Sequence, residues 1–68
     1  MVALNSSDLS GAEYDPWSAT LIIAFHSGGV YAYYGVPSSK FAGLLNASSH
    51  GKYFHAEIKP YYSYRRLR

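Results

Sequence analysis

The chain has 68 residues, of which 49% are hydrophobic, 18% aromatic and 15% charged, and its formal net charge is +2. This composition is typical of one small globular domain and excludes a collagen-like repeat, a disordered tail and a large multidomain enzyme. The absence of cysteine excludes disulfides, thiol nucleophiles and thiolate-bound zinc. We therefore expect a single domain over residues 1–68, with a basic, tyrosine-rich C-terminal segment over residues 59–68.

No segment of the sequence has the pattern of a membrane span or an export signal. The longest apolar run, from Leu21 to Phe25, is far shorter than the roughly 20 residues that a membrane-spanning helix needs. The first residues show neither the basic region nor the apolar core of a signal peptide. We therefore expect a cytoplasmic protein that does not bind a membrane.

A strong turn signal follows a first segment of mixed character. Gly11 to Tyr14 are predicted to begin a strand. In Asp15-Pro16-Trp17-Ser18, the proline ring sets φ at the second turn position, and the Asp15 carboxylate can accept a hydrogen bond from the backbone ahead. The chain is expected to reverse its direction here.

Residues 19–26 and 30–35 predict a β-hairpin, which is the clearest structural prediction of the sequence. In the first segment, Leu21, Ile23 and Phe25 alternate with their neighbours and so share one face of a strand. The glycines of the intervening Ser27-Gly28-Gly29 reach positive φ without a Cβ clash.

Two short helices are predicted to follow. Pro37 or Ser38 is expected to begin the first, which spans about nine residues with an apolar stripe formed by Phe41, Leu44 and Leu45.

Ser49 is expected to cap the second helix, in which Phe54 and Ile58 share a face, and Pro60 is expected to end it. Residues 61–64 are then predicted to form a short final strand or an extended tail.

This order of elements predicts an α+β fold. It consists of a small antiparallel β-meander of three to four strands, with the two short helices packed on one face. The apolar face of residues 21–25 is expected to receive the helices.

The ordered series of motifs resembles the KTSC domain family over roughly residues 6–66. The motifs are Tyr14-Asp15, Phe25, Gly28 or Gly29, Tyr31-x-Tyr33, Val36-Pro37, Phe41-x-x-Leu44, Ser49-x-Gly51-x-Tyr53-Phe54, Ile58-Lys59 and Tyr62-x-Tyr64. This family is named for its place at the C-terminus of some lysyl-tRNA synthetases, and it also occurs as a free-standing bacterial or phage protein. The resemblance implies the fold described above, no established catalytic residue, and RNA binding. His55 stands where the family pattern usually has Asn, so a role of that Asn side chain does not carry over.

Five of the six lysines and arginines follow residue 51 and are interleaved with tyrosines. Cationic groups bind phosphates and ring faces stack on bases, which are the two contacts that single-stranded nucleic acid offers. The sequence therefore predicts a non-catalytic module that binds RNA or another nucleic acid. The expected phosphate contacts are Lys52, Lys59, Arg65 and Arg66, and the expected stacking residues are Tyr31, Tyr33, Tyr62 and Tyr64. An equally weighted alternative is a solvated basic tail, because a net charge of +2 is low for a nucleic-acid-binding protein.

Two further functions remain open at this stage. Ser49, Gly51 and Lys52 open a helix, where backbone amides can bind an anion, so an oligomeric module that binds or sequesters a phosphorylated small ligand such as a nucleotide is one alternative. The spacing of a nucleotide-hydrolysing phosphate loop is absent, and helix capping explains the same residues without a ligand. The other alternative is a protein–protein interaction module, because Trp17, the tyrosines of residues 31–34 and the sheet edges would all favour a homo-oligomer.

The sequence carries no signal for catalysis, a cofactor or a metal. The spacing of His26, His50 and His55 does not match a zinc site, and no G-x-S-x-G motif is present. Turns account for Asp8 and Asp15. Solvation, or pairing with Lys52 or Arg65, accounts for Glu57. We therefore expect a protein that is not an enzyme and that binds neither metal nor cofactor.

Overall fold

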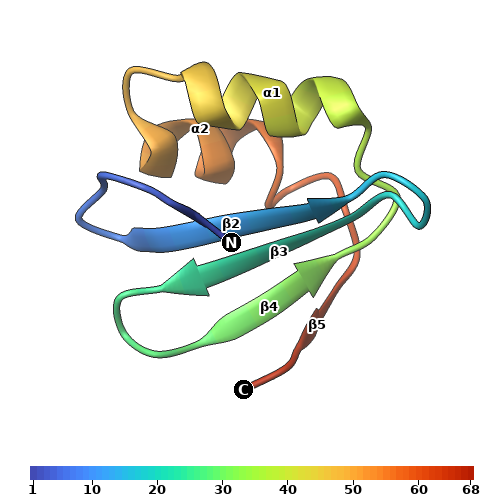
Figure 1. The fold of residues 1–68 in the computed structure, drawn as a ribbon, viewed down its shortest axis with the longest axis horizontal. Helices are drawn as coiled ribbons and strands as arrows, with labels where there is room; N and C mark the ends of the chain where they lie inside the picture. Colours follow the sequence, from blue (N-terminus) through green and yellow to red (C-terminus); the bar gives the residue numbers. More distant parts are fainter.

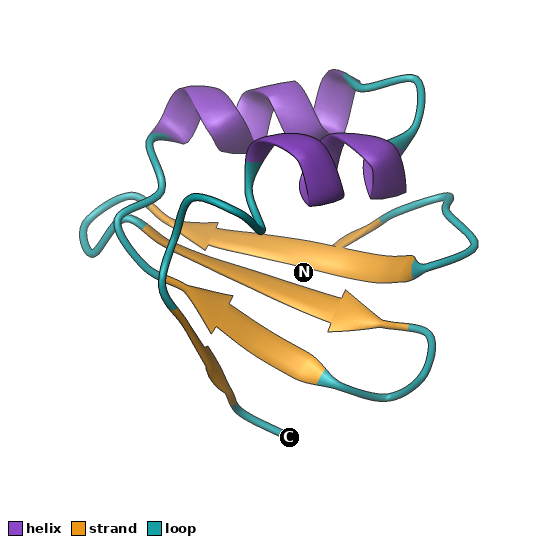
Figure 2. Ribbon diagram, turned by 180° about the vertical axis from the view of Figure 1, so that it is seen from behind, coloured by secondary structure: helices purple, strands orange, loops and turns teal.

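The computed structural model describes residues 1–68 as one five-stranded antiparallel sheet with two helices (Figure 1). In chain order the elements are β1 (Val2–Ala3), β2 (Leu9–Asp15), β3 (Thr20–Phe25), β4 (Val30–Tyr33), α1 (Ser38–Asn46), α2 (His50–Glu57) and β5 (Tyr64–Arg66). The strands lie side by side in the order of the chain, and both helices cover one face of the sheet while no helix covers the other (Figure 2). The predicted α+β fold is confirmed, with five strands in place of three to four.

The additional strand is β1, at the edge of the sheet. Val2 pairs with Ala12 and Ala3 pairs with Gly11. A strand of two residues is too short for an alternating pattern, so the sequence does not reveal it.

The final strand begins later than predicted. The chain continues to turn after α2, because the amide of Tyr61 donates to the carbonyl of Ile58. It reaches the edge of β4 only at Tyr64, which pairs with Tyr33. The strand predicted over residues 61–64 therefore lies at Tyr64–Arg66.

Both predicted reversals between strands are confirmed. Asp15 Oδ1 accepts a hydrogen bond from the amide of Trp17 at 3.0 Å, and Asp15 Oδ2 accepts one from the Ser18 hydroxyl at 2.9 Å. Between β3 and β4, Gly28 has φ +104°, a conformation that a side chain would strain. The turns thus align the apolar faces of three consecutive strands.

The helices begin where the sequence predicts. Pro37 directly precedes α1, and the Ser49 hydroxyl caps α2 by accepting a hydrogen bond from the amide of Lys52 at 3.3 Å. The Nζ atom of Lys40 lies 2.9 Å from Glu57 Oε1 and joins the two helices. The expected pairing of Glu57 with Lys52 or Arg65 is therefore wrong, because Lys40 on the neighbouring helix is the residue that reaches it.

The core lies between the sheet and the helices. Its largest fully buried side chains are Phe54, Leu9, Leu21, Ile23, Leu44, Ile58 and Val36. Beside this core, the Tyr14 ring stacks on Phe41 with centroids 5.2 Å apart, and its hydroxyl donates to the Val36 carbonyl at 2.6 Å. Neither helix has the length and apolar character to cross a membrane.

Candidate nucleic-acid interface

Two neighbouring hollows lie beside α2. The first, here called the polar groove, has a volume of about 840 Å³ and lies between residues 5–8 and the beginning of α2. The second, here called the aromatic pocket, has a volume of about 310 Å³ and lies between the ends of the strands and α2. Asp8 and His55 line both hollows, so these two side chains form the wall between them.

Hydrogen bonds hold the loop that forms one side of the polar groove. The Ser6 hydroxyl accepts from the amides of Asp8 and Leu9, both at 3.2 Å. The Nε2 atom of His26 lies 2.8 Å from the Ser6 carbonyl oxygen, and this nitrogen must donate because a carbonyl has no proton to give. The loop is therefore anchored to the sheet at both its side chain and its backbone.

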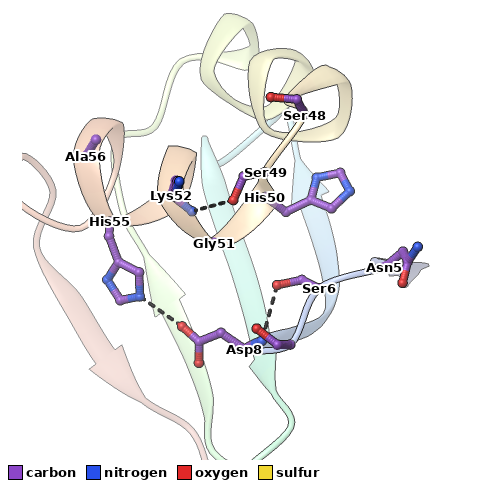
Figure 3. Close-up of a pocket in the computed structure, with 11 residues that line it drawn as sticks. Asn5, Ser6, Asp8, Ser48, Ser49, His50, Gly51, Lys52, His55 and Ala56 are labelled. Atoms are coloured by element: carbon purple, nitrogen blue, oxygen red, sulfur yellow. Dashed lines mark hydrogen bonds and ion pairs between the residues drawn. The ribbon is translucent and has the colours of Figure 1, made fainter.

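The opposite side of the polar groove is the first turn of α2. Figure 3 shows Ser49, His50, Gly51 and Lys52 following one another along this side. His50 Nδ1 lies 2.8 Å from the Leu44 carbonyl and so joins this turn to α1. Lys52 is exposed and brings a positive charge to the groove.

The wall between the hollows is a hydrogen-bonded pair of Asp8 and His55. Figure 3 shows the imidazole of His55 extending from α2 toward the Asp8 carboxylate, with His55 Nε2 2.8 Å from Asp8 Oδ2. Both side chains are 48% exposed, so the pair is open to solvent. The other carboxylate oxygen, Oδ1, makes no hydrogen bond within the protein.

Five aromatic rings form the apolar lining of the second hollow. In the order Phe25, Tyr31, Tyr64, Tyr33, Phe54 and back to Phe25, each ring contacts the next with centroids 5.2 to 5.8 Å apart. These side chains come from β3, β4, β5 and α2, and all of them line the pocket. The rings thus form a closed cycle of edge and tilted contacts, the geometry that aromatic pairs prefer.

The rings of the aromatic pocket differ in how much surface they expose. Tyr64 is 60% exposed, whereas Tyr33 is only 3% exposed. Burial, together with the neighbouring phenols of Tyr31 and Tyr64, raises the pKa of Tyr33 to about 12. Tyr33 is therefore a neutral part of the pocket base at physiological pH.

Polar groups surround the mouth of the aromatic pocket. Asp8, Ser27, His55 and Lys59 line it together with the rings. Beside it, the Arg66 guanidinium lies 5.5 Å from the centroid of the Tyr31 ring, a cation–π distance. The pocket therefore combines ring surfaces with groups of both charges.

The binding residues predicted from the sequence do not form one site in the structure; they lie in the two hollows and outside them. Lys52, a predicted phosphate contact, lines the polar groove together with Ser49 and Gly51, the predicted anion-binding residues at the start of the helix. Lys59, another predicted phosphate contact, lines the aromatic pocket. The same pocket contains three of the four predicted stacking residues: Tyr31, Tyr33 and Tyr64.

Three of the predicted residues line neither hollow. Arg66 lies over Tyr31, at the side of the aromatic pocket. Arg65 pairs with Ala32 in the sheet and, because side chains alternate along a strand, lies on the face opposite Arg66. Tyr62 packs against the hydrophobic core.

Sequence reasoning missed Asp8, His55, Phe25 and Phe54 as residues of the site. Asp8 and His55 are 47 positions apart, so no local motif connects them. In the sequence, a turn accounts for Asp8, and the alternation and helical spacing of apolar residues assign Phe25 and Phe54 to the core. No cluster of three or more His, Cys, Asp or Glu side chains with metal-binding geometry is present.

Comparisons with known proteins give consistent matches. The model of the KTSC domain family matches residues 5–62. An uncharacterized protein of Stutzerimonas stutzeri is 42% identical over 67 residues, which cover 97% of this chain and 94% of that protein. A lysine–tRNA ligase of Nostoc is 39% identical over 61 residues, which cover 90% of this chain but only 11% of the ligase. The crystal structure of a KTSC domain protein from Yersinia pestis matches with a TM-score of 0.94 and 32% identity, covering 97% of this chain and 93% of that one.

Proposed function

The chain belongs to the KTSC domain family, and from this premise we propose that it is a non-catalytic module that binds single-stranded RNA along the side of α2. The observation that carries the proposal is that the polar groove and the aromatic pocket lie side by side, separated only by the side chains of Asp8 and His55, which line both. A strand that follows both hollows would meet cations and ring surfaces in succession. These are the two contacts by which proteins bind single-stranded nucleic acid.

Three cations are available to phosphates along this path. Lys52 lines the groove, Lys59 lines the pocket, and Arg66 lies beside the pocket on Tyr31. No side-chain carboxylate of the protein pairs with any of the three. Arg66 donates from Nε to the Arg68 backbone oxygen at 2.7 Å, so Lys52 and Lys59 are the two cations whose side chains make no hydrogen bond within the domain.

One relative supports RNA as the ligand. The Nostoc relative is a lysine–tRNA ligase, an enzyme named for its action on a transfer RNA, and the matching segment is a small part of it. A small attached module that contacts RNA would suit such a protein.

The test is binding of a short, unstructured, fluorescently labelled RNA, measured by anisotropy over a range of salt concentrations. With three phosphate contacts, we expect log K to fall against log salt with a slope of about −2. The double variant Lys52→Gln/Lys59→Gln should weaken binding by about tenfold at low salt. The matched control is Arg65→Gln, which removes a cation from the other face of the sheet and should leave binding unchanged.

Other outcomes contradict the proposal and favour one of the alternatives. Tight binding of mononucleotides with a shallow salt dependence would favour a module for phosphorylated small ligands. A molecular size that rises with protein concentration, without RNA binding, would favour protein association. An Arg65→Gln variant as impaired as the double lysine variant would show that binding does not follow the side of α2.

A further inference from the structure

The aromatic pocket has the shape and polarity of a site for one base. We infer that it accepts a single nucleobase that carries an exocyclic amino group, and that the Asp8 carboxylate accepts a hydrogen bond from that group. This inference rests on the proposed RNA binding and adds a preference among bases to it.

The size and lining of the pocket favour one planar ring system. Its volume of about 310 Å³ is at the lower end of the range of about 300–1,000 Å³ for small-molecule sites. Five aromatic side chains line this space, but Phe54 and Tyr33 are buried, so the exposed ring of Tyr64 and the partly exposed rings of Phe25 and Tyr31 supply the surface for stacking. Stacking on aromatic side chains is a general way in which proteins hold an unstacked base.

The polar group that faces the bound ring is an acceptor. An ionised carboxylate has lone pairs but no proton, so Asp8 can only accept hydrogen bonds. His55 Nε2 donates to Asp8 Oδ2 at 2.8 Å, which holds the carboxylate at the pocket, while Oδ1 has no partner within the protein. Asp8 Oδ1 is therefore an oriented acceptor for a ligand, whereas the Ser27 hydroxyl of the same pocket can rotate to accept or to donate and so distinguishes bases less.

This acceptor distinguishes bases by one substituent. Cytosine, adenine and guanine each carry an amino group that can donate to Asp8. Uracil has no amino group, and its donor at this edge, N3–H, lies between two carbonyl oxygens that a carboxylate repels. Lys59 is exposed and is a flexible point charge, so it suits a phosphate better than an oriented contact to a base. The expected preference is therefore for cytosine over uracil when pyrimidines are compared.

The experiment compares oligocytidine with oligouridine of equal length in the unaltered protein. The two RNAs carry the same charge, and their bases have rings of the same size and differ at N3 and C4, so a difference in affinity reports the edge that carries the amino group of cytosine. We expect oligocytidine to bind about five- to tenfold more tightly, as expected for one hydrogen bond to a charged acceptor. Cytidine monophosphate, tested in parallel, distinguishes a free nucleotide from a base within RNA as the source of the ring.

Two variants test the role of Asp8. Asp8→Asn keeps the shape of the side chain but adds a donor, so the preference for oligocytidine should fall to about twofold or less. The matched control, Glu13→Gln, removes a carboxylate that pairs with the N-terminal ammonium at 3.3 Å, outside both hollows, and should keep the full preference.

The possible results separate this inference from the proposed function. Equal affinity for both RNAs, with the expected salt dependence and loss in the double lysine variant, would overturn the base preference and leave RNA binding in place. Tighter binding of oligouridine would also overturn it. Absence of binding to either RNA would overturn both, whereas a cytosine preference that disappears in Asp8→Asn alone would support both.

Discussion

Tyrosine side chains supply part of the hydrophobic core of this small domain. Tyr14 packs its ring on Phe41 while its hydroxyl reaches the backbone of Val36. Tyr33 is almost entirely buried and contacts both Phe54 and Tyr64. The ring supplies apolar area and the hydroxyl remains a polar group, so the ionisation of a buried tyrosine becomes coupled to folding.

Tyr33 should make the protein less stable at alkaline pH. Its pKa is about 12 in the folded protein, against 10.0 for an ordinary tyrosine, so between these values the unfolded chain releases a proton that the folded chain retains. The stabilisation is complete below pH 10 and is lost as the pH rises toward 12, by about 2 to 3 kcal/mol in the free energy of unfolding. Urea unfolding at several pH values measures this loss.

The Tyr33→Phe variant serves as the control for this effect, because it cannot ionise at this position. We expect its free energy of unfolding to fall less steeply over the same pH range. Parallel curves for the two proteins would contradict the assignment to Tyr33.

At the scale of elements, the two helices approach closely at a glycine. A Cβ atom built on Gly43 in α1 would overlap the hydroxyl and ring of Tyr53 in α2. The Lys40–Glu57 ion pair joins the same two helices, and its hydrogen bond raises the pKa of Lys40 above its usual range. The position of α1 relative to α2 therefore depends on the absence of one methyl group.

Gly43→Ala should destabilise the domain although alanine favours a helix. We expect a loss of about 1 to 3 kcal/mol in the free energy of unfolding, because Tyr53 must move from its packed position. In a Tyr53→Ala background the same substitution should instead stabilise by up to about 1 kcal/mol, because only the helix propensity remains. Chemical denaturation of the four proteins measures both effects, and a stabilised single variant would contradict the close packing.

How well each element could be predicted depends on whether its signal is local. The hairpin of β3 and β4 and the starts of both helices follow from glycine, proline and serine at fixed positions, and the structure confirms them. Strand β1 and the true position of β5 depend on which segment happens to reach a sheet edge. That outcome is decided by tertiary packing, which a short pattern does not contain.

On the scale of the whole molecule, the sheet is most strongly supported at its centre. β3 has a strand on each side, whereas β1 and β5 are edge strands of two and three residues. Residues 64–66 are exposed, while Leu21 and Ile23 in β3 are fully buried. Edge strands with few buried contacts open more readily than the centre of a sheet.

Hydrogen exchange should reveal this gradient. We expect the amides of β3 to exchange only through global unfolding, and those of β5 to exchange faster through local opening. Exchange followed by two-dimensional NMR measures both in one sample. Equal protection of β3 and β5 would show that the strands unfold as one unit.

The residues of the candidate site could be predicted only in part, because tertiary packing decides which of them meet. Lys52, Lys59 and the tyrosines attract attention by their chemistry, and several of them do line the two hollows. Alternation along a strand, by contrast, separates Arg65 from Arg66, although they are neighbours in the sequence. Asp8 and His55 meet only because the loop before β2 folds against α2.

The shared wall formed by Asp8 and His55 has a thermodynamic consequence. Any occupant of one hollow that moves either side chain also alters the other hollow, so the two binding equilibria are linked. Linkage is reciprocal: the factor by which the first occupant changes the affinity for the second equals the factor in the opposite direction. If RNA occupies both hollows as proposed, the unit bound in one hollow would change the affinity of the other hollow for the next unit.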